Sequence, residues 1–167
     1  ARQEVGASVV PDVVEELVDN NILRQFERGV FVRSGRLNLD SVWPNDGLVY
    51  VIHQRADVTI AQGAQLTLEP GVILKFGVAE GHENDSDLIV EGTLNAIAGD
   101  GENIIFTSFK DDVGGDTNAD GVGSVPERGD WGQLSFRGEG TGNLDGIDLR
   151  FGGGGGNGNC CGANRSA

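Results

Sequence analysis

Two stretches of the chain decide its fold: residues 58–76 have the sequence VTIAQGAQLTLEPGVILKF, and residues 88–107 have the sequence LIVEGTLNAIAGDGENIIFT. Each contains three short apolar runs that are rich in β-branched residues and separated by turn residues, which is typical of short strands. The two stretches share the same order of parts. Strands this short cannot bury their own faces, so the repetition predicts a solenoid in which each coil covers the previous one.

The repeat is uneven in length. Ile60 corresponds to Val90 and Leu66 to Leu94, which gives offsets of 30 and 28 residues, and the third apolar runs, which begin at residues 72 and 104, are 32 residues apart. Further apolar runs lie on both sides, at residues 30–32, 48–52, 134–136 and 147–151. No helical stretch separates the runs, so a doubly wound α/β fold is disfavoured. The sequence therefore predicts an all-β fold, a parallel β-helix.

A helix is expected before the first strand. Pro11 suits the first turn of a helix, acidic residues follow it at the positive end, and Ser8 is a possible cap. Apolar side chains recur at helical spacing over residues 10–18. A helix this short must pack on something, and covering the open end of the coil stack is its expected role.

The region from residue 50 to residue 153 resembles the right-handed parallel β-helix repeat proteins of bacterial secreted and surface polypeptides. The motifs that carry the resemblance are Trp43, YVI at 50–52, VTI at 58–60, LTLEPGV at 66–72, GTLNA at 92–96, IFTS at 105–108 and GDWG at 129–132. The resemblance implies the fold and an extracellular or cell-surface location. It implies little about activity, because lyases, adhesins and other surface proteins share this repeat.

These observations divide the chain into three parts. Residues 1–29 are expected to form the helical cap, residues 30–151 the β-helix with an insertion at 111–130, and residues 152–167 a glycine-rich tail. The tail holds Cys160 and Cys161, which are adjacent and have no second cysteine pair for a zinc site. A strained disulfide between them, pairing outside the chain, and two incidental thiols are all compatible with this position.

The charge of the chain is concentrated in one segment. The formal net charge is −14, and residues 80–130 hold thirteen acidic residues against only Lys110 and Arg128. Such acidity disfavours binding to nucleic acid or to an anionic membrane surface. No window contains the roughly 18 unbroken apolar residues of a membrane-spanning helix. Like charges repel unless cations lie among them, so this segment is a candidate ion site.

Residues 116–127 of that segment match the calcium-loop pattern D-x-[DN]-x-[DN]-G-x5-E in full. Oxygens at alternate positions of a tight loop can converge on one hard cation, Gly121 permits the sharp turn, and a late carboxylate closes the shell. The expected Ca²⁺ ligands are the side chains of Asp116, Asn118, Asp120, Glu127 and Ser124, and the carbonyl of Val122. Asp111, Asp112 and Asp130 flank the loop and could replace any of these.

The loop departs from an EF-hand in three ways. Gly114 and Gly115 precede it where a helix should run, Pro126 falls within it, and Gly123 occupies a position that is normally hydrophobic. We therefore expect a calcium loop inserted between β-helix coils. A second acidic stretch at residues 80–87, which includes His82, has ligand-type residues without a recognised spacing, and an exposed loop is the expected structure there.

The sequence is compatible with three classes of function. The favoured hypothesis is a secreted or cell-surface structural or adhesive module, stabilised by calcium and part of a larger assembly or longer chain. Glycines follow Phe151 with no visible cap, so other copies or further coils of the same polypeptide are the expected partners, by end-to-end stacking. The alternatives are a polysaccharide lyase and a glycan-binding module. No catalytic residues are assigned, and enzymatic activity is disfavoured without being excluded.

Overall fold

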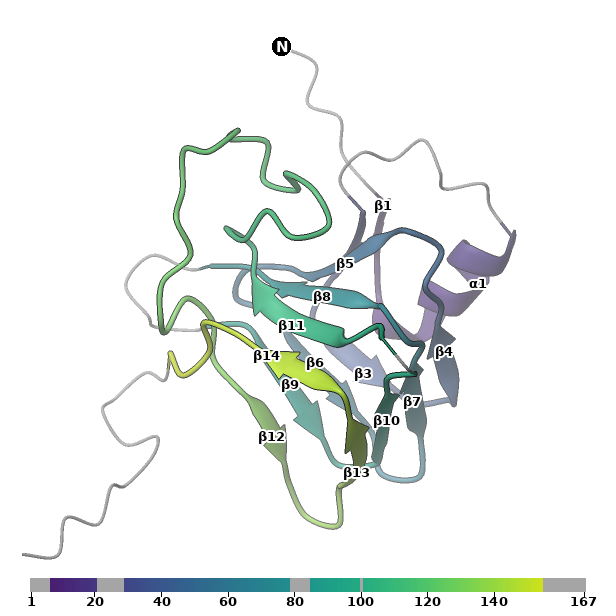
Figure 1. Cartoon of the computed structure of the whole chain (residues 1–167). Coiled ribbons are helices and arrows are strands. Elements are labelled where there is room, and N and C mark those ends of the chain that lie inside the picture. Colours follow the sequence, from purple (N-terminus) through teal and green to yellow (C-terminus); the bar gives the residue numbers. More distant parts are fainter. Residues whose placement is uncertain (1–6, 21–28, 79–84, 100, 155–167) are drawn as a thin grey trace, which may run out of the picture.

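A computed structural model describes residues 7–20, 29–78, 85–99 and 101–154 (Figure 1). Within these residues the strands form three sheets whose strand pairs are parallel. The first sheet has the order β1-β2-β5-β8-β11-β14, the second β12-β9-β6-β3 and the third β13-β10-β7-β4. The predicted all-β class, with one short amino-terminal helix, is confirmed.

The elements have the following bounds. The first-sheet strands are β1 (Ala7–Val9), β2 (Val30–Val32), β5 (Val49–Ile52), β8 (Ile73–Phe76), β11 (Ile104–Ser108) and β14 (Ile147–Leu149). The second-sheet strands are β3 (Gly35–Leu37), β6 (Asp57–Ile60), β9 (Asp87–Val90) and β12 (Leu134–Phe136). The third-sheet strands are β4 (Ser41–Trp43), β7 (Gln65–Leu68), β10 (Thr93–Ile97) and β13 (Thr141–Asp145). The helical elements are the 3₁₀ turn η1 (Pro11–Val13) and α1 (Val14–Asn20).

From β2 onward the chain passes through the three sheets in rotation. Each passage from the first sheet through the second and third, and back to the first, is called a circuit below. Successive circuits pair at the offsets that the sequence repeat predicts: Ile60 is opposite Val90, Leu66 is opposite Leu94, and β8 pairs with β11 at an offset of 32 residues, from Ile73 to Ile105. The repeat in the sequence is therefore the pairing register of the sheets.

Alternate side chains of the strands build the core. Val58 and Ile60 on β6, and Leu66 and Leu68 on β7, are almost completely buried, as are the residues opposite them in the next circuit. Aromatic side chains stack within this core: Phe76 lies 4.0 Å from Trp131 between ring centroids. Removing an aliphatic or aromatic side chain from water contributes roughly 1.5–3 kcal/mol, so stacking one circuit on the next stabilises the fold.

The amino-terminal segment covers the first circuit. β1 adds to β2 in the first sheet, while η1 packs against β3 and α1 against β4. Asp12 Oδ1 accepts a hydrogen bond from the Asn38 N–H at 2.6 Å, and Glu15 Oε2 accepts one from the Val42 N–H at 2.9 Å. These carboxylates satisfy main-chain donors that another strand would otherwise have to pair.

Two details of the cap differ from the sequence prediction. Ser8 lies in β1 and does not cap the helix; the residue before η1 is Val10, which has no side-chain capping bond. The sequence does not predict the strand β1, because its three residues, Ala7–Val9, are too few to establish a strand pattern. Its backbone is ordered by pairing with β2 rather than by its own composition.

The crossings from the first sheet to the second differ in length from circuit to circuit. The first two crossings use only residues 33–34 and 53–56, whereas the next two use residues 77–86 and 109–133. The candidate calcium loop lies in the longest of these crossings. No helix among the described residues has the length and apolar character needed to cross a membrane.

Candidate functional sites: the acidic loop and the last circuit

The loop between β11 and β12, residues 109–133, extends away from the sheets in Figure 1 as the green segment above β8 and β11. Residues 80–130, most of which belong to this loop and to the preceding circuit, carry thirteen acidic residues. Three side chains from its base, Asp111, Lys110 and Asp130, and one from the sheet below, Lys75, hold it in place.

Lys75 fixes the first part of the loop to the first sheet. It lies on β8 between Leu74 and Phe76, whose side chains enter the core, so it points the other way, and the loop buries it completely. Its Nζ donates hydrogen bonds to Asp111 O at 2.5 Å, Gly115 O at 2.9 Å and Thr117 Oγ1 at 2.9 Å. An ammonium group has three donors, and all three are used.

Burial lowers the pKa of Lys75 from its ordinary value, and the nearby charges of Asp111, Asp112 and Asp116 partly oppose this effect. A charged group in a site of low polarity is costly unless it is hydrogen-bonded and paired. The three loop acceptors and the surrounding carboxylates are therefore what permits a lysine at this position. Lys75 in turn supplies positive charge beneath the most acidic part of the chain.

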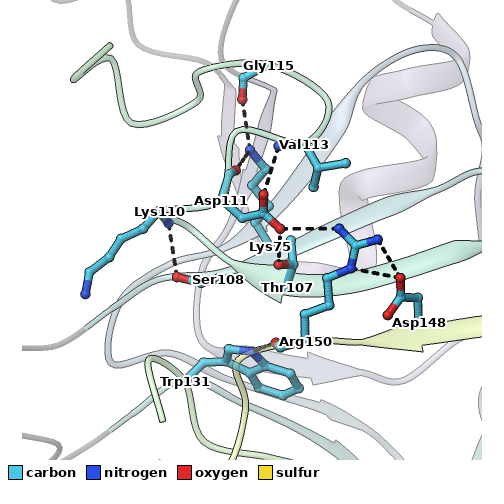
Figure 2. Close-up of polar contacts among 10 residues, drawn as sticks. All are labelled: Lys75, Thr107, Ser108, Lys110, Asp111, Val113, Gly115, Trp131, Asp148 and Arg150. Carbon is cyan, nitrogen blue, oxygen red and sulfur yellow. Dashed lines mark hydrogen bonds and ion pairs between the residues drawn. The ribbon is translucent and has the colours of Figure 1, made fainter. Parts of the chain in front are cut away.

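Asp111 connects the loop to β11 and to the last circuit (Figure 2). Its Oδ2 accepts a hydrogen bond from Thr107 Oγ1 at 2.6 Å, and its Oδ1 accepts one from the Val113 N–H at 3.1 Å. Arg150, just after β14, lies 3.7 Å from Asp111 Oδ2 and also forms an ion pair with Asp148. These contacts join the loop to side chains from two successive circuits.

Asp130 closes the other end of the loop. It is buried, and its carboxylate accepts hydrogen bonds from Ser108 Oγ and Lys110 Nζ, both at 2.7 Å, and from the Glu127 N–H at 2.9 Å. The neighbouring Trp131 donates its indole N–H to Arg150 O at 2.7 Å. The base of the loop is thus tied to the same segment that Asp111 contacts.

The structure brings together the first half of the predicted calcium loop. Asp116 Oδ1 and Asn118 Oδ1 both accept from the Asp120 N–H, at 3.1 and 3.3 Å, and Asp116 Oδ2 accepts from the Gly121 N–H at 2.9 Å. Asn118 Nδ2 donates to Asp120 Oδ2 and to Ser124 Oγ, both at 2.9 Å. Gly121 has a φ of 71°, in the left-handed region that glycine adopts without strain.

Within the described part of the chain, no hydrogen bond joins the other predicted ligands, Asp112, Val122, Glu127 and Asp130, to this group. Val122 and Glu127 are exposed, and the carbonyl of Asp112 accepts a hydrogen bond from the Gly115 N–H. Asp130 is held by its three donors at the base of the loop. Among the described residues, no three acidic, histidine or cysteine side chains converge as they would around a metal ion. The ligand assignment and the calcium itself stay predictions.

The donor set nevertheless has the chemistry that calcium prefers. Asp116, Asn118, Asp120 and Ser124 offer carboxylate, amide and hydroxyl oxygens, and Ca²⁺ takes six to eight oxygens in flexible geometries. All four residues are among the ligands predicted from the sequence. The sequence pattern did not reveal Lys75, which in a strand of apolar residues has the appearance of an ordinary exposed lysine, nor the role of Asp111 and Asp130 as anchors. Cys160, Cys161 and His82 lie outside the described residues.

The last circuit, β12, β13 and β14, differs from those below it in burial. Phe136, Leu144 and Leu149 are 41%, 37% and 51% exposed. The residues opposite them in the preceding circuit, Val90, Ala96 and Phe106, are fully buried. Core positions therefore become surface positions at this end, because no described residue covers them.

No protein-family model matches the chain, and the searches of curated proteins and of solved structures found no significant match.

Proposed function

We propose that the chain is a right-handed parallel β-helix module of a secreted or cell-surface structural or adhesive assembly, and that calcium stabilises it. The observation that carries the proposal is the last circuit, where side chains at core positions are exposed. Large apolar side chains in register with a finished core mark a contact surface. Strands whose outer main-chain groups are not paired also invite further strands to add.

The β-helix assignment is supported by the rotation of the chain through three sheets and by the parallel pairing of equivalent residues from circuit to circuit. In such a molecule each repeat contacts its neighbours only, so stability grows with every repeat that is stacked. A rigid scaffold of this kind suits a structural or adhesive role, in which the module holds its partners at fixed positions.

Calcium is proposed to bind within residues 116–127. Asp116, Asn118, Asp120 and Ser124 would contribute side-chain oxygens, and Glu127 and the Val122 carbonyl would complete the set. The ion would supply positive charge to the most acidic segment of the chain. Lys75 and Lys110 already do this at the base of the loop, where they contact Asp111 O and Asp130, so the ion would extend the same neutralisation to its tip.

Calcium binding is tested by thermal unfolding with and without a chelator. A ligand that binds only the folded state stabilises it by mass action, by about 2.7 kcal/mol at a hundredfold excess over its Kd. We expect Ca²⁺ to raise the Tm of the wild-type chain, and Asp116→Asn with Asp120→Asn to abolish the increase. Asp46→Asn, at an exposed position outside the loop, is the matched control. Identical melting curves with calcium and with chelator would exclude the site.

The assembly role is tested by sedimentation velocity of the purified chain over a wide concentration range. We expect species larger than the monomer at high concentration, since the last circuit is then covered by another molecule. A chain that stays monomeric throughout would contradict a role in assembly. This result would leave the calcium proposal intact, because the two rest on separate parts of the molecule.

A further inference from the structure

We propose that two copies of this chain associate through their last circuits to form a closed, two-fold symmetric dimer. This inference rests on the proposed function, in which the last circuit is a contact surface, and it adds the identity and orientation of the partner. Three observations carry it: the two ends of the circuit stack differ, the uncovered end is apolar, and it is nearly neutral on a strongly acidic chain.

The capped amino-terminal end of the stack is a poor partner for the uncovered end. At the amino-terminal end η1 and α1 lie over the second and third sheets, and core residues such as Leu37 and Trp43 are almost completely buried. The carboxylates of Asp12 and Glu15 already accept hydrogen bonds from edge N–H groups there. A second copy that approached this end would have to displace the cap, so head-to-tail growth into a filament is disfavoured.

The uncovered end exposes several apolar side chains. A cavity of about 410 Å³ lies there, and its lining includes Trp131, Leu134, Leu149 and Phe151 together with Arg128, Gln133 and glycines. Phe136 and Leu144 extend the exposed apolar surface along β12 and β13. Removing such side chains from water favours association, and in a symmetric contact each is buried twice.

The charge distribution favours a second copy at this end. Residues 133–154 carry Arg137 and Arg150 against Glu139, Asp145 and Asp148, whereas the whole chain has a net charge of −14. Two identical acidic molecules repel each other least where each has the lowest net charge. Arg150 and Asp148 form an ion pair at this end. A two-fold axis would place this ion pair opposite the same ion pair of the second copy.

The topology makes such a contact geometrically consistent. A two-fold axis normal to the first sheet places β14 beside β14 of the second copy and reverses its direction, so the two strands are antiparallel. The same operation exchanges the other two faces, which places β12 beside β13 of the second copy, again antiparallel. Each outer strand therefore gains a partner, and an interface of this kind contacts the same patch on both molecules and closes at two.

The experiment combines sedimentation equilibrium with a substitution at the uncovered end. We expect a monomer–dimer equilibrium with no larger species, and we expect Leu149→Lys to weaken dimerisation roughly tenfold or more, since a buried charge at the centre of an interface costs more than about 1.4 kcal/mol. Leu39→Lys is the matched control, because Leu39 is 70% exposed and lies between β3 and β4, at the capped end. Circular dichroism verifies that both variants fold.

Chemical cross-linking reports the orientation independently. In a background with Cys160→Ser and Cys161→Ser, Asp148→Cys on β14 should cross-link to its own counterpart with a short thiol-reactive reagent. Val42→Cys on β4 at the capped end should not. Cross-linking of Val42→Cys as efficiently as of Asp148→Cys would overturn the proposed orientation.

The remaining outcomes separate this inference from the proposed function. A species that grows steadily with concentration would show an open assembly, which overturns the closed dimer and leaves the assembly role intact. A chain that stays monomeric at the highest concentration would overturn both. A dimer that Leu149→Lys does not weaken would place the interface elsewhere and overturn the inference.

Discussion

Lys75 shows how a single side chain organises a loop of 25 residues. It is one of only two lysines in the chain, and its ammonium group contacts residues 111, 115 and 117 at once. The other lysine, Lys110, contacts the buried Asp130 at the base of the same loop. Both lysines of this acidic protein thus lie where the carboxylates are most concentrated.

The role of Lys75 can be tested by its replacement with methionine, which keeps the length of the side chain and removes its donors. Each buried acceptor left without a partner costs roughly 1–3 kcal/mol, so we expect the loop to open more often in Lys75→Met. Trypsin should then cleave after Arg128 at least about tenfold faster, since about 1.4 kcal/mol corresponds to a factor of ten. The same loop contains Lys110, a second trypsin cleavage site, so mass spectrometry is used to assign each fragment to the site at which it was cut. Ile73→Met, on the same strand, is the control, and equal cleavage rates in the two variants would contradict this role.

Asp87 makes the stability of the protein depend on pH. Burial raises its pKa from the ordinary value of 3.8, and the charge of Asp57 adds to this, while hydrogen bonds from Gln133 and the charge of Arg137 oppose it. The folded protein therefore binds a proton at Asp87 more readily than the unfolded chain does. Ionisation of Asp87 costs stability, and this cost develops as the pH rises from the unfolded pKa through the folded pKa.

We therefore expect Asp87→Asn to raise the Tm relative to the wild-type chain more at pH 7 than at pH 3.5, where the wild-type carboxyl is already largely protonated. Thermal melts at the two pH values measure this difference. Asp46→Asn, at an exposed position, should change the Tm little at either pH. A change for Asp87→Asn that is the same at both pH values would contradict the assignment.

At the scale of the elements, the sequence predicts most of the apolar strands, whereas two polar strands have no signal of their own. β3 begins with Gly-Arg, and β13 has the sequence Thr-Gly-Asn-Leu-Asp. Glycine, asparagine and aspartate are depleted in strands, so neither segment has a strand signal of its own. Both form because a strand of the neighbouring circuit offers an edge: β3 pairs with β6, and β13 with β10.

The same distinction applies to the candidate calcium loop. The spacing of Asp116, Asn118 and Asp120 is local, so the pattern could identify a segment whose oxygens come together. The anchors could not be identified, because Asp111 and Asp130 differ from the other acidic residues only in what surrounds them. Their partners, such as Thr107 and Ser108, become neighbours through the path of the chain at the end of β11.

The cap of the first circuit has a measurable contribution. In Asp12→Ala the Asn38 N–H loses the acceptor that it contacts at 2.6 Å. By analogy with the loss of a helix-capping side chain, we expect a decrease of about 0.5–2 kcal/mol in the free energy of unfolding. Chemical denaturation measures this decrease, and Asp46→Ala, outside the cap, is the control. If both substitutions had the same small effect, the contact would contribute nothing to stability.

At the scale of the whole molecule, acidic residues are concentrated in the loop at residues 109–133. This loop holds six acidic residues against Lys110 and Arg128: Asp111, Asp112, Asp116, Asp120, Glu127 and Asp130. A like-charged cluster destabilises the folded state through repulsion, and salt screens this repulsion with a Debye length of about 30 Å at 0.01 M and 10 Å at 0.1 M.

We therefore expect sodium chloride to raise the Tm of the calcium-free protein between 0.01 and 0.2 M. The increase should be smaller when calcium is bound, because the ion would already neutralise part of the cluster. Thermal melts over this range of salt, with and without Ca²⁺, measure both effects. A Tm that falls with added salt would mean that attractive ion pairs, such as Arg150 with Asp148, outweigh the repulsion.

The cap that Asp12 and Glu15 fasten over the first circuit also has a consequence for synthesis. The ribosome makes the amino-terminal end first, so the closed end of the stack is complete before the later strands exist. Every subsequent strand then meets a finished template with unpaired N–H and C=O groups and can join it as soon as it emerges. The stack can thus form in one direction, from the first circuit to the last, and the most recently formed circuit is always the exposed one.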